Sequence, residues 1–504
     1  MRRRLLALVL LLFLALAGVG AAYYRHETRP REVLGSSTEE FVEAANPADT
    51  RTTPALPEPG EPVAPTATAA ENPRRKPQVR QVPPRAKPKP AQRKRLKPLN
   101  GVEWWPTYGY DEARSHVAPG YRLRPPFRRL WRFRARHYIE FPPAVAYGRL
   151  YVAQQTGRFF AVNTLTGRIL WKKHFRRCLA ASPVVQDGVV YQAVMHRLPC
   201  GTGNRRARGF VVAMDARTGR ELWRFGAGAV ESTPLLRGKT LYFGSWDHRL
   251  YAVDIRRGRL RWSYRADDEV NTSPAYAGGT LFFGTDGGRL HAVWVKTGKR
   301  RWRNSSFSRF GRREYFYASP TVAYGRVYIG NTDGTMYAYG ASSGRLLWAQ
   351  RAGTYVYTAA AVWKKRVYVG TYDGWVIAFD AATGRQRWRQ RAPAAVHGAP
   401  TILSGLIYFS TCGNCGQRGS RYARRGPSLT FALDARNGRR VWTFRDGRYS
   451  PIVADAKRVY LVGRTSVYAL EPRSGKKATP KKKAAAKPKR KAAPARTRRA
   501  ASRG

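Results

Sequence analysis

Short runs of alternating apolar and small or polar residues recur from residue 102 to residue 471, and turn residues separate them. The clearest copy spans residues 366–388 and has the sequence RVYVGTYDGWVIAFDAATGRQRW. Its β-branched and aromatic residues alternate with small or polar ones, which is typical of strands. Asp373-Gly374 and Thr383-Gly384 suit tight turns, because glycine adopts a positive φ without steric penalty. The segment therefore predicts three strands joined by two tight turns.

This unit recurs along the chain. A tryptophan closes each copy, and most copies open with a proline preceded by Ser, Thr, Ala or Pro; the copy near residues 359–361 lacks the proline. The closing residues are Trp131, Trp171, Trp223, Trp262, Trp302, Trp348, Trp388 and Trp442. A unit of about 40 residues with four strands is typical of a propeller blade.

The two ends of the repeat region fit together. Residues 450–470 supply three strands and no tryptophan, whereas residues 125–131 form one strand with no partner before it. One blade made from both ends closes a ring and leaves no exposed strand edge. We therefore predict an all-β, eight-bladed β-propeller of four-stranded blades over residues 102–471. The alternative is a seven-bladed ring with a stray N-terminal strand and an open final blade.

The turn before each tryptophan carries the most specific motif. Residues 213–223 and 378–388 follow the pattern Ala-x-Asp-x-x-Thr-Gly-x-x-x-Trp, which resembles the tryptophan-docking motif of the pyrroloquinoline-quinone (PQQ) repeat. The resemblance implies that each tryptophan stacks between neighbouring blades, against the peptide of the next unit's glycine. Relatives with this repeat include quinoprotein alcohol and glucose dehydrogenases, the assembly lipoprotein BamB and sensor domains of bacterial kinases. The resemblance is thus specific for fold and weak for function.

Charge is the second strong signal. The formal net charge is +62, and residues 101–475 alone carry 62 Lys and Arg against 22 Asp and Glu. A field of this sign attracts polyanions such as nucleic acid, anionic lipid headgroups or phosphate-rich wall polymers. The alternative is an Arg-rich surface that serves only solubility.

The N-terminus predicts export. Residues 2–4 are arginines, and the uncharged apolar run over residues 5–24 has about the 20 residues that a spanning helix needs. We expect residues 1–24 to be a signal anchor, a single-pass transmembrane helix that holds the propeller on the extracytoplasmic side of the cell membrane. The alternative is a signal peptide cleaved before Gly18, and the propeller leaves the cytoplasm in both cases.

The segments on either side of the repeats are predicted to be disordered. Residues 25–101 form a Pro-rich linker that becomes basic towards its end, and residues 472–504 are a low-complexity tail of Lys, Arg, Ala and Pro. Such compositions cannot bury enough apolar area to offset chain entropy. Their charge would bind nucleic acid non-specifically.

A quinoprotein dehydrogenase is the main enzymatic hypothesis. The resemblance implies PQQ on the ring axis, Ca²⁺ held by Glu, Asn and Asp, an Asp base, and often a disulfide between adjacent cysteines. The sequence has no adjacent Cys pair, and most Asp residues fall in repeated turns, which Asp favours. We interpret the remaining cluster, Asp267-Asp268-Glu269 with Asn271, as a solvated acidic loop. We therefore predict no catalytic residue, metal or cofactor, and disfavour PQQ and Ca²⁺.

Four cysteines suggest disulfides, since an exported chain meets an oxidising environment. The simplest pairing is Cys178 with Cys200 and Cys412 with Cys415. Propeller connections alternate faces, so we expect all four on one face. The loops that carry them are the candidate binding face, with Arg205, Arg206, Arg208, Arg418, Arg421, Arg424 and Arg425.

Three interpretations of Cys412-x-x-Cys415 stay open. It is a structural clip, or a redox-active pair without the helix start that lowers a thiol pKa, or half of a zinc site. The aromatic residues of 315–317 and 355–357 likewise have two interpretations, because they either line the axial funnel or pack in the core. The histidines show no ligand spacing.

We expect a non-catalytic, membrane-anchored module that binds a protein, peptide or envelope polyanion, analogous to BamB. The chain departs from BamB in its charge and in having no cysteine before Cys178 to carry a lipid. The alternatives are a PQQ-dependent quinoprotein dehydrogenase and a propeller that binds nucleic acid or another polyanion.

Overall fold

The computed structural model describes residues 102–198, 200, 207–306, 308–309, 312–413, 415 and 423–473. The predicted signal anchor, the linker, nearly all of the tail, and Arg205, Arg206, Arg418 and Arg421 lie outside the described residues. Among the described residues, no helix is long and apolar enough to cross a membrane.

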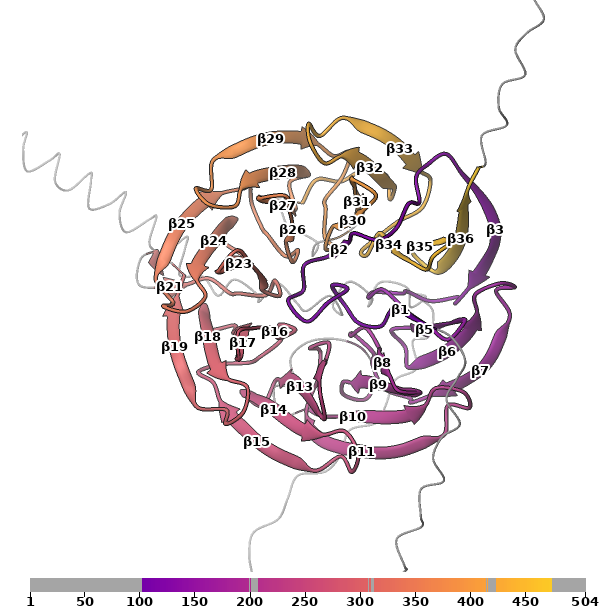
Figure 1. Cartoon of the computed structure of the whole chain (residues 1–504), viewed down its shortest axis with the longest axis horizontal. Helices are drawn as coiled ribbons and strands as arrows, with labels where there is room; N and C mark the ends of the chain where they lie inside the picture. The colour runs from indigo at the N-terminus through magenta and orange to yellow at the C-terminus, as the bar shows by residue number, and fades with distance from the viewer. Residues whose placement is uncertain are drawn as a thin grey trace, which may run out of the picture.

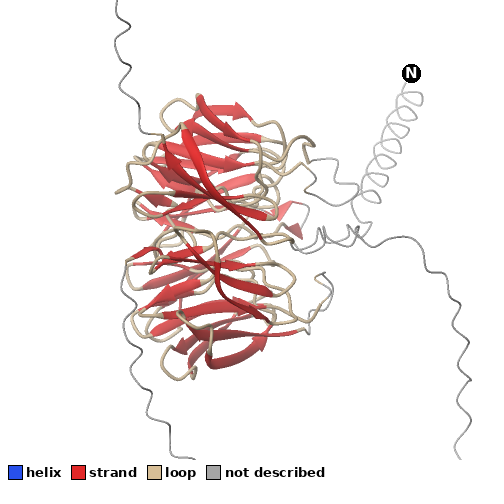
Figure 2. Cartoon of the chain, turned by 90° about the vertical axis from the view of Figure 1, so that its right-hand side faces the viewer, coloured by secondary structure: helices blue, strands red, loops and turns tan. Residues whose placement is uncertain are grey.

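Eight sheets surround a central axis as the blades of a propeller (Figure 1), and Figure 2 shows the same ring from its side. Each blade has an inner, a second, a third and an outer strand. The inner strands of blades 1 to 8 are β4 (Ala144–Ala146), β8 (Val184–Gln186), β12 (Leu235–Arg237), β16 (Ala275–Ala277), β22 (Thr321–Ala323), β26 (Ala361–Trp363), β30 (Thr401–Leu403) and β34 (Ile452–Ala454). The second strands are β5 (Arg149–Ala153), β9 (Val189–Val194), β13 (Thr240–Ser245), β17 (Thr280–Gly284), β23 (Arg326–Gly330), β27 (Arg366–Gly370), β31 (Leu406–Ser410) and β35 (Val459–Val462).

The remaining strands complete the blades. The third strands are β6 (Arg158–Asn163), β10 (Arg208–Asp215), β14 (Arg249–Asp254), β18 (Arg289–Trp294), β24 (Thr335–Gly340), β28 (Trp375–Asp380), β32 (Thr430–Asp434) and β36 (Ser466–Pro472). The outer strands are β7 (Ile169–His174), β11 (Glu221–Gly228), β15 (Leu260–Arg265), β19 (Arg300–Ser305), β25 (Leu346–Arg351), β29 (Gln386–Arg391), β33 (Arg440–Phe444) and β3 (Phe127–Arg134). A separate hairpin pairs β20 (Ser308–Arg309) with β21 (Arg312–Arg313).

The eighth blade is made from both ends of the described chain. Strand β3 pairs antiparallel with β36, with Trp131 opposite Ala469, and Arg128 forms an ion pair with Glu471 at 2.6 Å. The prediction of eight four-stranded blades is confirmed. The seven-bladed alternative is wrong, because β3 completes the sheet of β34, β35 and β36.

The core lies between the faces of neighbouring blades. In β27, Val367, Tyr368 and Val369 are each at most 1% exposed, because a blade covers each side of the sheet. The outer strands differ: β29 exposes every residue except the half-buried Trp388. Burial therefore falls from the axis to the circumference.

At seven of the eight blade junctions, the turn between third and outer strands clamps a blade to its neighbour, whereas Trp442 of blade 7 packs against Phe127 of blade 8. Nε1 of Trp348 donates a 3.2 Å hydrogen bond to the Ala381 carbonyl of the next blade. Gly384 has a φ of +74°, and a Cβ added there would lie 2.7 Å from the Trp348 ring. Asp380 shapes this turn, because its Oδ1 accepts 3.0 Å bonds from the backbone of Ala382 and Thr383. The same approach joins Trp131 to Gly167, Trp171 to Gly219, Trp223 to Gly258, Trp262 to Gly298, Trp302 to Gly344 and Trp388 to Gly438.

An N-terminal segment, residues 102–121, crosses the central opening of the ring (Figure 1) and is called the axial plug. Its β1 (Glu103–Trp105) extends blade 1 beside β4, and its β2 (Val117–Ala118) pairs parallel with β30 of blade 7. Between these strands, backbone amides of the inner strands bond plug carbonyls: Val185 to Pro106, Tyr276 to Glu112, Val322 to Ala113, Val362 to Ser115 and Ile402 to His116. The plug therefore ties six blades together at the axis.

Arg114 anchors the plug at the centre of the ring and is fully buried. Its guanidinium donates to the carbonyls of Pro274 at 3.1 Å, Pro234 at 3.0 Å and Thr233 at 3.3 Å, which belong to blades 3 and 4. It also donates to the Thr107 hydroxyl and the Tyr108 carbonyl within the plug. Burial lowers the pKa of Arg114 to about 10, so this group is cationic at neutral pH.

Candidate functional site on the ring axis

Equivalent loops lead from each outer strand to the next inner strand and present side chains near the axis. The repeated position lies three residues before the opening proline or its equivalent, as Glu231 lies before Pro234. The residues at this position are Glu140, Ala180, Glu231, Asn271, Tyr317, Tyr357, His397 and Arg448. Six of these eight, all except Ala180 and Arg448, line one axial pocket.

Hydroxyl groups immediately before the prolines hold neighbouring loops in register. The Thr233 hydroxyl accepts a 3.0 Å bond from the Ser182 backbone, and Ser273 accepts one of 3.0 Å from Thr233. Ser319 continues the series, because its hydroxyl accepts a 2.9 Å bond from the Ser273 backbone. This series explains why Ser or Thr precedes the proline in blades 3 to 5.

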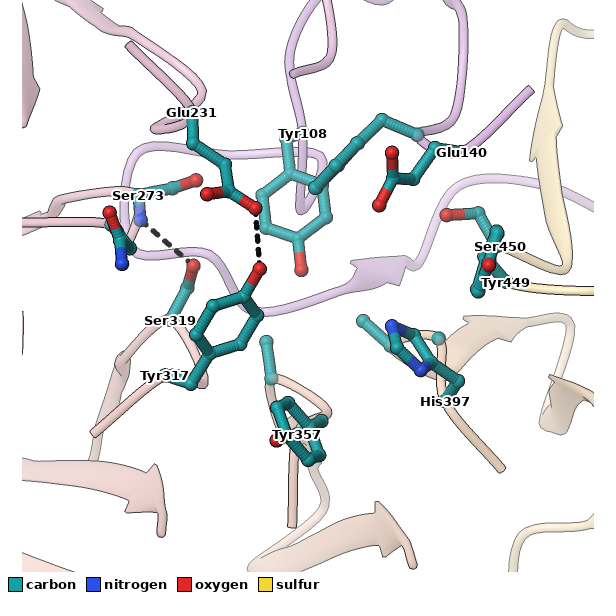
Figure 3. Close-up of a pocket in the computed structure, with 15 residues that line it drawn as sticks. Tyr108, Glu140, Glu231, Ser273, Tyr317, Ser319, Tyr357, His397, Tyr449 and Ser450 are labelled. Atoms are coloured by element: carbon teal, nitrogen blue, oxygen red, sulfur yellow. Dashed lines mark hydrogen bonds between the residues drawn. The ribbon is translucent and has the colours of Figure 1, made fainter. Parts of the chain in front are cut away.

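The pocket has a cavity volume of about 60 Å³ and lies among these loops (Figure 3). Two carboxylates line it, Glu140 of the loop into blade 1 and Glu231 of the loop into blade 3. Its aromatic lining residues are Tyr108, Phe141, Tyr317, Tyr357, His397 and Tyr449. The site therefore combines buried acids with aromatic walls.

The aromatic residues form a continuous wall from blade 5 to blade 8. The rings of Tyr317 and Tyr357 meet edge-on with centroids 5.1 Å apart, and Tyr357 stacks on His397 at 5.7 Å. His397 in turn meets the Tyr449 ring at 4.6 Å, and the Tyr372 hydroxyl and His397 Nδ1 share a hydrogen bond. Burial raises the pKa of Tyr357 far above its ordinary value, so its ring stays a neutral phenol.

Acidic groups gather at and behind one side of the pocket. Tyr317 donates a hydrogen bond to Oε1 of Glu231, which is 3% exposed. Next to it, Asn271 donates a 2.9 Å bond to Asp286. Burial raises the pKa of Asp286 well above its ordinary value, and the charges of Glu269, Asp268 and Glu231 raise it further. Negative charge is therefore concentrated here.

The plug supplies Tyr108, whose ring lies near the centre of the close-up between Glu231 and Glu140 (Figure 3). Tyr108 meets the His116 ring edge-on at 4.9 Å, and the Arg114 guanidinium lies 5.7 Å from its centroid. Burial, together with the Arg114 charge, lowers the pKa of His116 to about 3. The imidazole is therefore neutral, and the plug closes the axis with a largely aromatic surface.

The residues at the axis do not fit the quinone and calcium ion of a quinoprotein. Among the described residues, no group of three or more His, Cys, Asp or Glu could hold a metal ion. A cavity of about 60 Å³ is far below the ~300 Å³ or more of pockets for ligands of that size. PQQ also carries three carboxyl groups, which Glu140 and Glu231 would repel.

The two predicted disulfides are present and lie against the pocket wall. Cys178 bonds Cys200 with an S–S distance of 2.04 Å, and Cys412 bonds Cys415. The first pair belongs to a buried cluster against which Phe141 packs, and the second shares a buried cluster with Tyr449. Each bond thus supports one aromatic residue of the pocket.

The predicted arginine face is described in part. Arg208, Arg424 and Arg425 are exposed, and none of them lines the axial pocket. The Arg424 backbone donates to the Tyr372 carbonyl at 2.9 Å and accepts from Ala395 at 2.8 Å. The connection between β31 and β32, which carries Arg424, therefore contacts Tyr372, whose hydroxyl shares a hydrogen bond with His397 of the aromatic wall.

The predicted aromatic segments divide between the two roles considered for them. Tyr317 and Tyr357 line the pocket, whereas Phe316 is fully buried in the core. The interpretation of residues 267–269 with Asn271 as a solvated loop is wrong for Glu269 and Asn271, which are buried, whereas Asp267 and Asp268 are half-buried. Glu269 is 7% exposed, and Asp267 bonds the buried His291 at 2.5 Å, because the loop packs against blade 4.

Sequence reasoning missed Glu140, Glu231, His397 and Tyr108 of the pocket. The signal available for the first three was their shared position, three residues before the proline that opens each blade. Tyr108 carries no repeat signal, because it belongs to the plug.

A second feature is the basic belt, defined as the Lys and Arg residues of the eight outer strands. These are Arg128, Arg129, Arg132, Arg134, Lys172, Lys173, Arg224, Arg261, Arg265, Arg300, Arg301, Arg303, Arg351, Arg387, Arg389, Arg391 and Arg440. Within these described strands, Glu221 is the only acidic residue. The belt therefore places positive charge around the circumference.

Comparisons with known proteins agree on the repeat. The family model described as "Outer membrane protein assembly factor BamB" matches residues 126–269, 200–362 and 332–503. The quinohemoprotein alcohol dehydrogenase ADH IIB of Pseudomonas putida is 32% identical over 141 residues, which cover 25% of this chain and 19% of that protein. BamB of Yersinia pestis is 29% identical over 135 residues, which cover 25% of this chain and 31% of that protein. The chain thus matches less than a third of the length of either curated relative.

A solved structure shows the same fold. BamB from Moraxella catarrhalis superposes with a TM-score of 0.54 and 17% sequence identity, covering 68% of this chain and 99% of that one. At this identity the likeness concerns the fold alone.

Proposed function

Because the chain belongs to the family described as outer membrane protein assembly factor BamB, we propose that it is a non-catalytic, membrane-anchored scaffold. Residues 1–24 hold the propeller outside the cytoplasm, and the basic belt binds an anionic, phosphate-rich polymer of the cell envelope. The observation that carries this proposal is the distribution of charge, since the positive side chains lie on the exposed outer strands.

The belt has far more positive groups than neighbouring acids can neutralise. Among the described residues, five ion pairs involve a belt residue: Arg128–Glu471, Lys173–Glu221, Arg224–Glu221, Arg261–Asp254 and Arg387–Asp380. Exposed pairs of this kind contribute little stability, about 0–1 kcal/mol each. The belt is therefore available to an external anion at small cost.

Aromatic side chains orient part of the belt. The guanidinium groups of Arg389 and Arg391 lie 3.7 Å and 4.3 Å from the ring centroid of Trp375. Stacking of this kind fixes the plane of a guanidinium and leaves its N–H edges for a phosphate. Two adjacent, oriented guanidinium groups favour a ligand with repeated phosphates.

A polymer fits this surface better than a protein does. The core of a protein interface is depleted in charge and needs clustered apolar residues. On the outer strands, the exposed large apolar side chains are the adjacent Ile169 and Leu170 of blade 1 and single residues of blades 3, 5 and 7, namely Leu260, Leu347 and Val441. Binding of another protein, as an assembly factor requires, is the competing outcome of the test.

The test titrates the full-length protein with inorganic polyphosphate over a series of salt concentrations. We expect Arg389→Gln with Arg391→Gln to weaken binding and to reduce the slope of log K against log salt by about two. The matched control is Lys364→Gln with Lys365→Gln, since these exposed lysines lie in an inner hairpin with Lys364 over the Trp363 ring. An equal effect of both pairs would refute the belt.

Deletion of residues 476–504 separates the belt from the basic tail. We expect polyphosphate binding to persist in the shortened protein with a smaller salt slope. If binding of polyphosphate and of DNA disappears together with the tail, the propeller is not the polyanion-binding part. If polyglutamate competes as well as polyphosphate does, the partner is an acidic protein segment.

A dehydrogenase is the second candidate, because one relative is a quinohemoprotein alcohol dehydrogenase. PQQ and Ca²⁺ are added to the full-length protein, and dye reduction is measured with alcohols and sugars. We expect no change of the absorbance spectrum and no dye reduction. A clear positive in both measurements would replace the scaffold with an enzyme.

A further inference from the structure

We propose that the axial pocket binds an organic cation, a primary ammonium or guanidinium group carried by a peptide side chain or by a free amine. This inference goes beyond the scaffold function, since the pocket and the basic belt are separate surfaces. The belt lies on the outer strands, whereas the pocket lies among loops at the axis and has two carboxylates in its lining.

The two carboxylates approach the same small space from different blades. In the close-up, Glu231 and Glu140 lie on either side of the Tyr108 ring and point towards the pocket (Figure 3). Both are almost fully buried, with exposures of 3% and 4%. A carboxylate taken out of water loses hydration, and a cation placed beside it offsets that loss.

The electrostatic field at this end of the pocket favours positive charge. Burial and then the charges of Glu269, Asp268 and Glu231 raise the pKa of the neighbouring Asp286. A cation next to Glu231 would relieve this mutual repulsion. Among the described residues, Arg114 and Arg448 are the buried arginines, and neither residue lines the pocket.

Those two arginines have contacts of their own, and the contact of Arg448 with Tyr449 reaches the pocket wall. Arg114 donates to carbonyls of the plug and of blades 3 and 4. The Arg448 guanidinium lies over the rings of Tyr138 at 4.6 Å and Tyr449 at 5.0 Å. Their positive charges weaken the negative potential of the pocket. The residues that line the pocket are still acidic and aromatic.

The aromatic wall selects an organic cation over a metal ion. Faces of neutral aromatic rings attract ammonium and guanidinium groups within ~6 Å by about 0.5–2 kcal/mol each. The rings of Tyr317, Tyr357, His397 and Tyr449 follow one another around the pocket. A metal ion instead needs several converging ligands, and the described residues provide no group of three.

The volume limits the ligand to a head group. The cavity of about 60 Å³ is several times the ~10–15 Å³ that one enclosed water needs. It is far too small for a whole drug-sized ligand, which takes ~300 Å³ or more. The pocket therefore suits the end of a lysine or arginine side chain whose backbone stays outside.

Calorimetric titration of the full-length protein tests this. The probes are N-acetyl-lysine methylamide, N-acetyl-arginine methylamide and n-butylammonium, and the neutral control is N-acetyl-norleucine methylamide. Salt is set high enough to abolish polyphosphate binding at the belt, because a buried ion pair is screened less than an exposed one. We expect a cationic probe to bind at least tenfold more tightly than the norleucine derivative.

Variants locate the binding. We expect Glu231→Gln and Tyr357→Leu each to weaken binding of the cationic probe at least tenfold, and Glu471→Gln on blade 8 to leave it unchanged. Binding of norleucine as tight as lysine, no binding of any cation, or wild-type affinity in Glu231→Gln would overturn the proposal. If Glu231→Gln does not fold, the melting temperature of the wild type is measured with the lysine derivative and with the norleucine derivative. A larger rise with the lysine derivative supports the cation site, and equal rises overturn it.

Two further comparisons complete the design. A lysine or arginine derivative that binds more tightly than butylammonium identifies a peptide as the source of the cation, and the reverse order identifies a free amine. Both orders support the cation site. Polyphosphate binding of Glu231→Gln is measured in parallel, so that failure of the pocket and failure of the belt are distinguished.

Discussion

The Tyr317 hydroxyl bonds the Glu231 carboxylate although 86 residues and one whole blade separate them. Glu231 lies in the loop into blade 3 and Tyr317 in the loop into blade 5. Asn271 of blade 4 lies between them in sequence and bonds Asp286 instead. Loops of blades that are not adjacent can contact each other only at the axis, because all blades converge there. The chemistry of the pocket therefore depends on the closed ring.

The raised pKa of Asp286 makes stability depend on pH. The folded protein holds this proton more tightly than the unfolded chain does, so the stabilising effect is complete below the ordinary pKa of Asp. It is lost as the pH rises through the raised value. We expect Asp286→Asn to melt higher than the wild type at neutral pH and the difference to vanish near pH 3. Thermal melts between about pH 3 and pH 8 measure this, and parallel curves would contradict it.

The repeat predicted the blades because each blade reuses one local pattern. Alternation, Asp-Gly turns and the docking tryptophan are properties of neighbouring residues, and Trp348 with Gly384 is one of seven such contacts. Ring closure could also be predicted, since the unpaired strand that ends at Trp131 and the unpaired final sheet complement each other.

The pocket and the plug could not be predicted in the same way. Glu140, Glu231 and His397 lie in different repeats, and their proximity follows only from the geometry of the whole ring. The plug has no repeat to align with, and its Arg114 is fully buried although arginine is normally exposed. Glu269 was predicted to be solvent-exposed, but it is buried by residues from other parts of the chain, which the local sequence does not reveal.

The docking turn predicts a difference between two glycines of equal backbone conformation. Gly384 and Gly188 have φ angles of +74° and +73°, but an added Cβ meets the Trp348 ring at 2.7 Å only at Gly384. At Gly188 nothing lies within 4 Å. Gly188→Ala should cost about 1–2 kcal/mol for the left-handed conformation alone. Gly384→Ala should cost about 1–3 kcal/mol more, from overpacking.

Urea unfolding of both glycine variants measures the two free energies. Equal losses would show that the ring of Trp348 yields without cost and that the turn does not clamp the blades.

The two disulfides should differ in their contribution to stability. The Cys178–Cys200 bond closes a loop with a sequence separation of 22, and the Cys412–Cys415 bond one of only 3. The chain-entropy model gives about 3.4 kcal/mol for the longer loop and about 1.6 kcal/mol for the shorter one. Paired Cys→Ala variants, compared by urea unfolding without reductant, check the order. A larger loss for Cys412→Ala with Cys415→Ala would mean that support of Tyr449 outweighs loop entropy.

The plug offers a matched pair of arginines for the last prediction. Arg114 is fully buried and has carbonyl partners in the plug and in two blades. Arg237 instead forms a 2.5 Å ion pair with the plug residue Glu112, and the two side chains are 41% and 39% exposed. Arg114→Met leaves several buried oxygens without a donor and should cost about 3–5 kcal/mol. Arg237→Met removes a solvent-screened pair and should cost about 0–1 kcal/mol.

Hydrogen exchange adds a local readout to the unfolding free energies. In Arg114→Met, amides that bond plug carbonyls, such as those of Val322 and Ile402, should lose protection, and in Arg237→Met they should keep it. If both variants lose the same stability and the same protection, the buried guanidinium does not fix the plug. The plug would then be held by its backbone hydrogen bonds to the inner strands, and the position of Tyr108 in the pocket would not depend on Arg114.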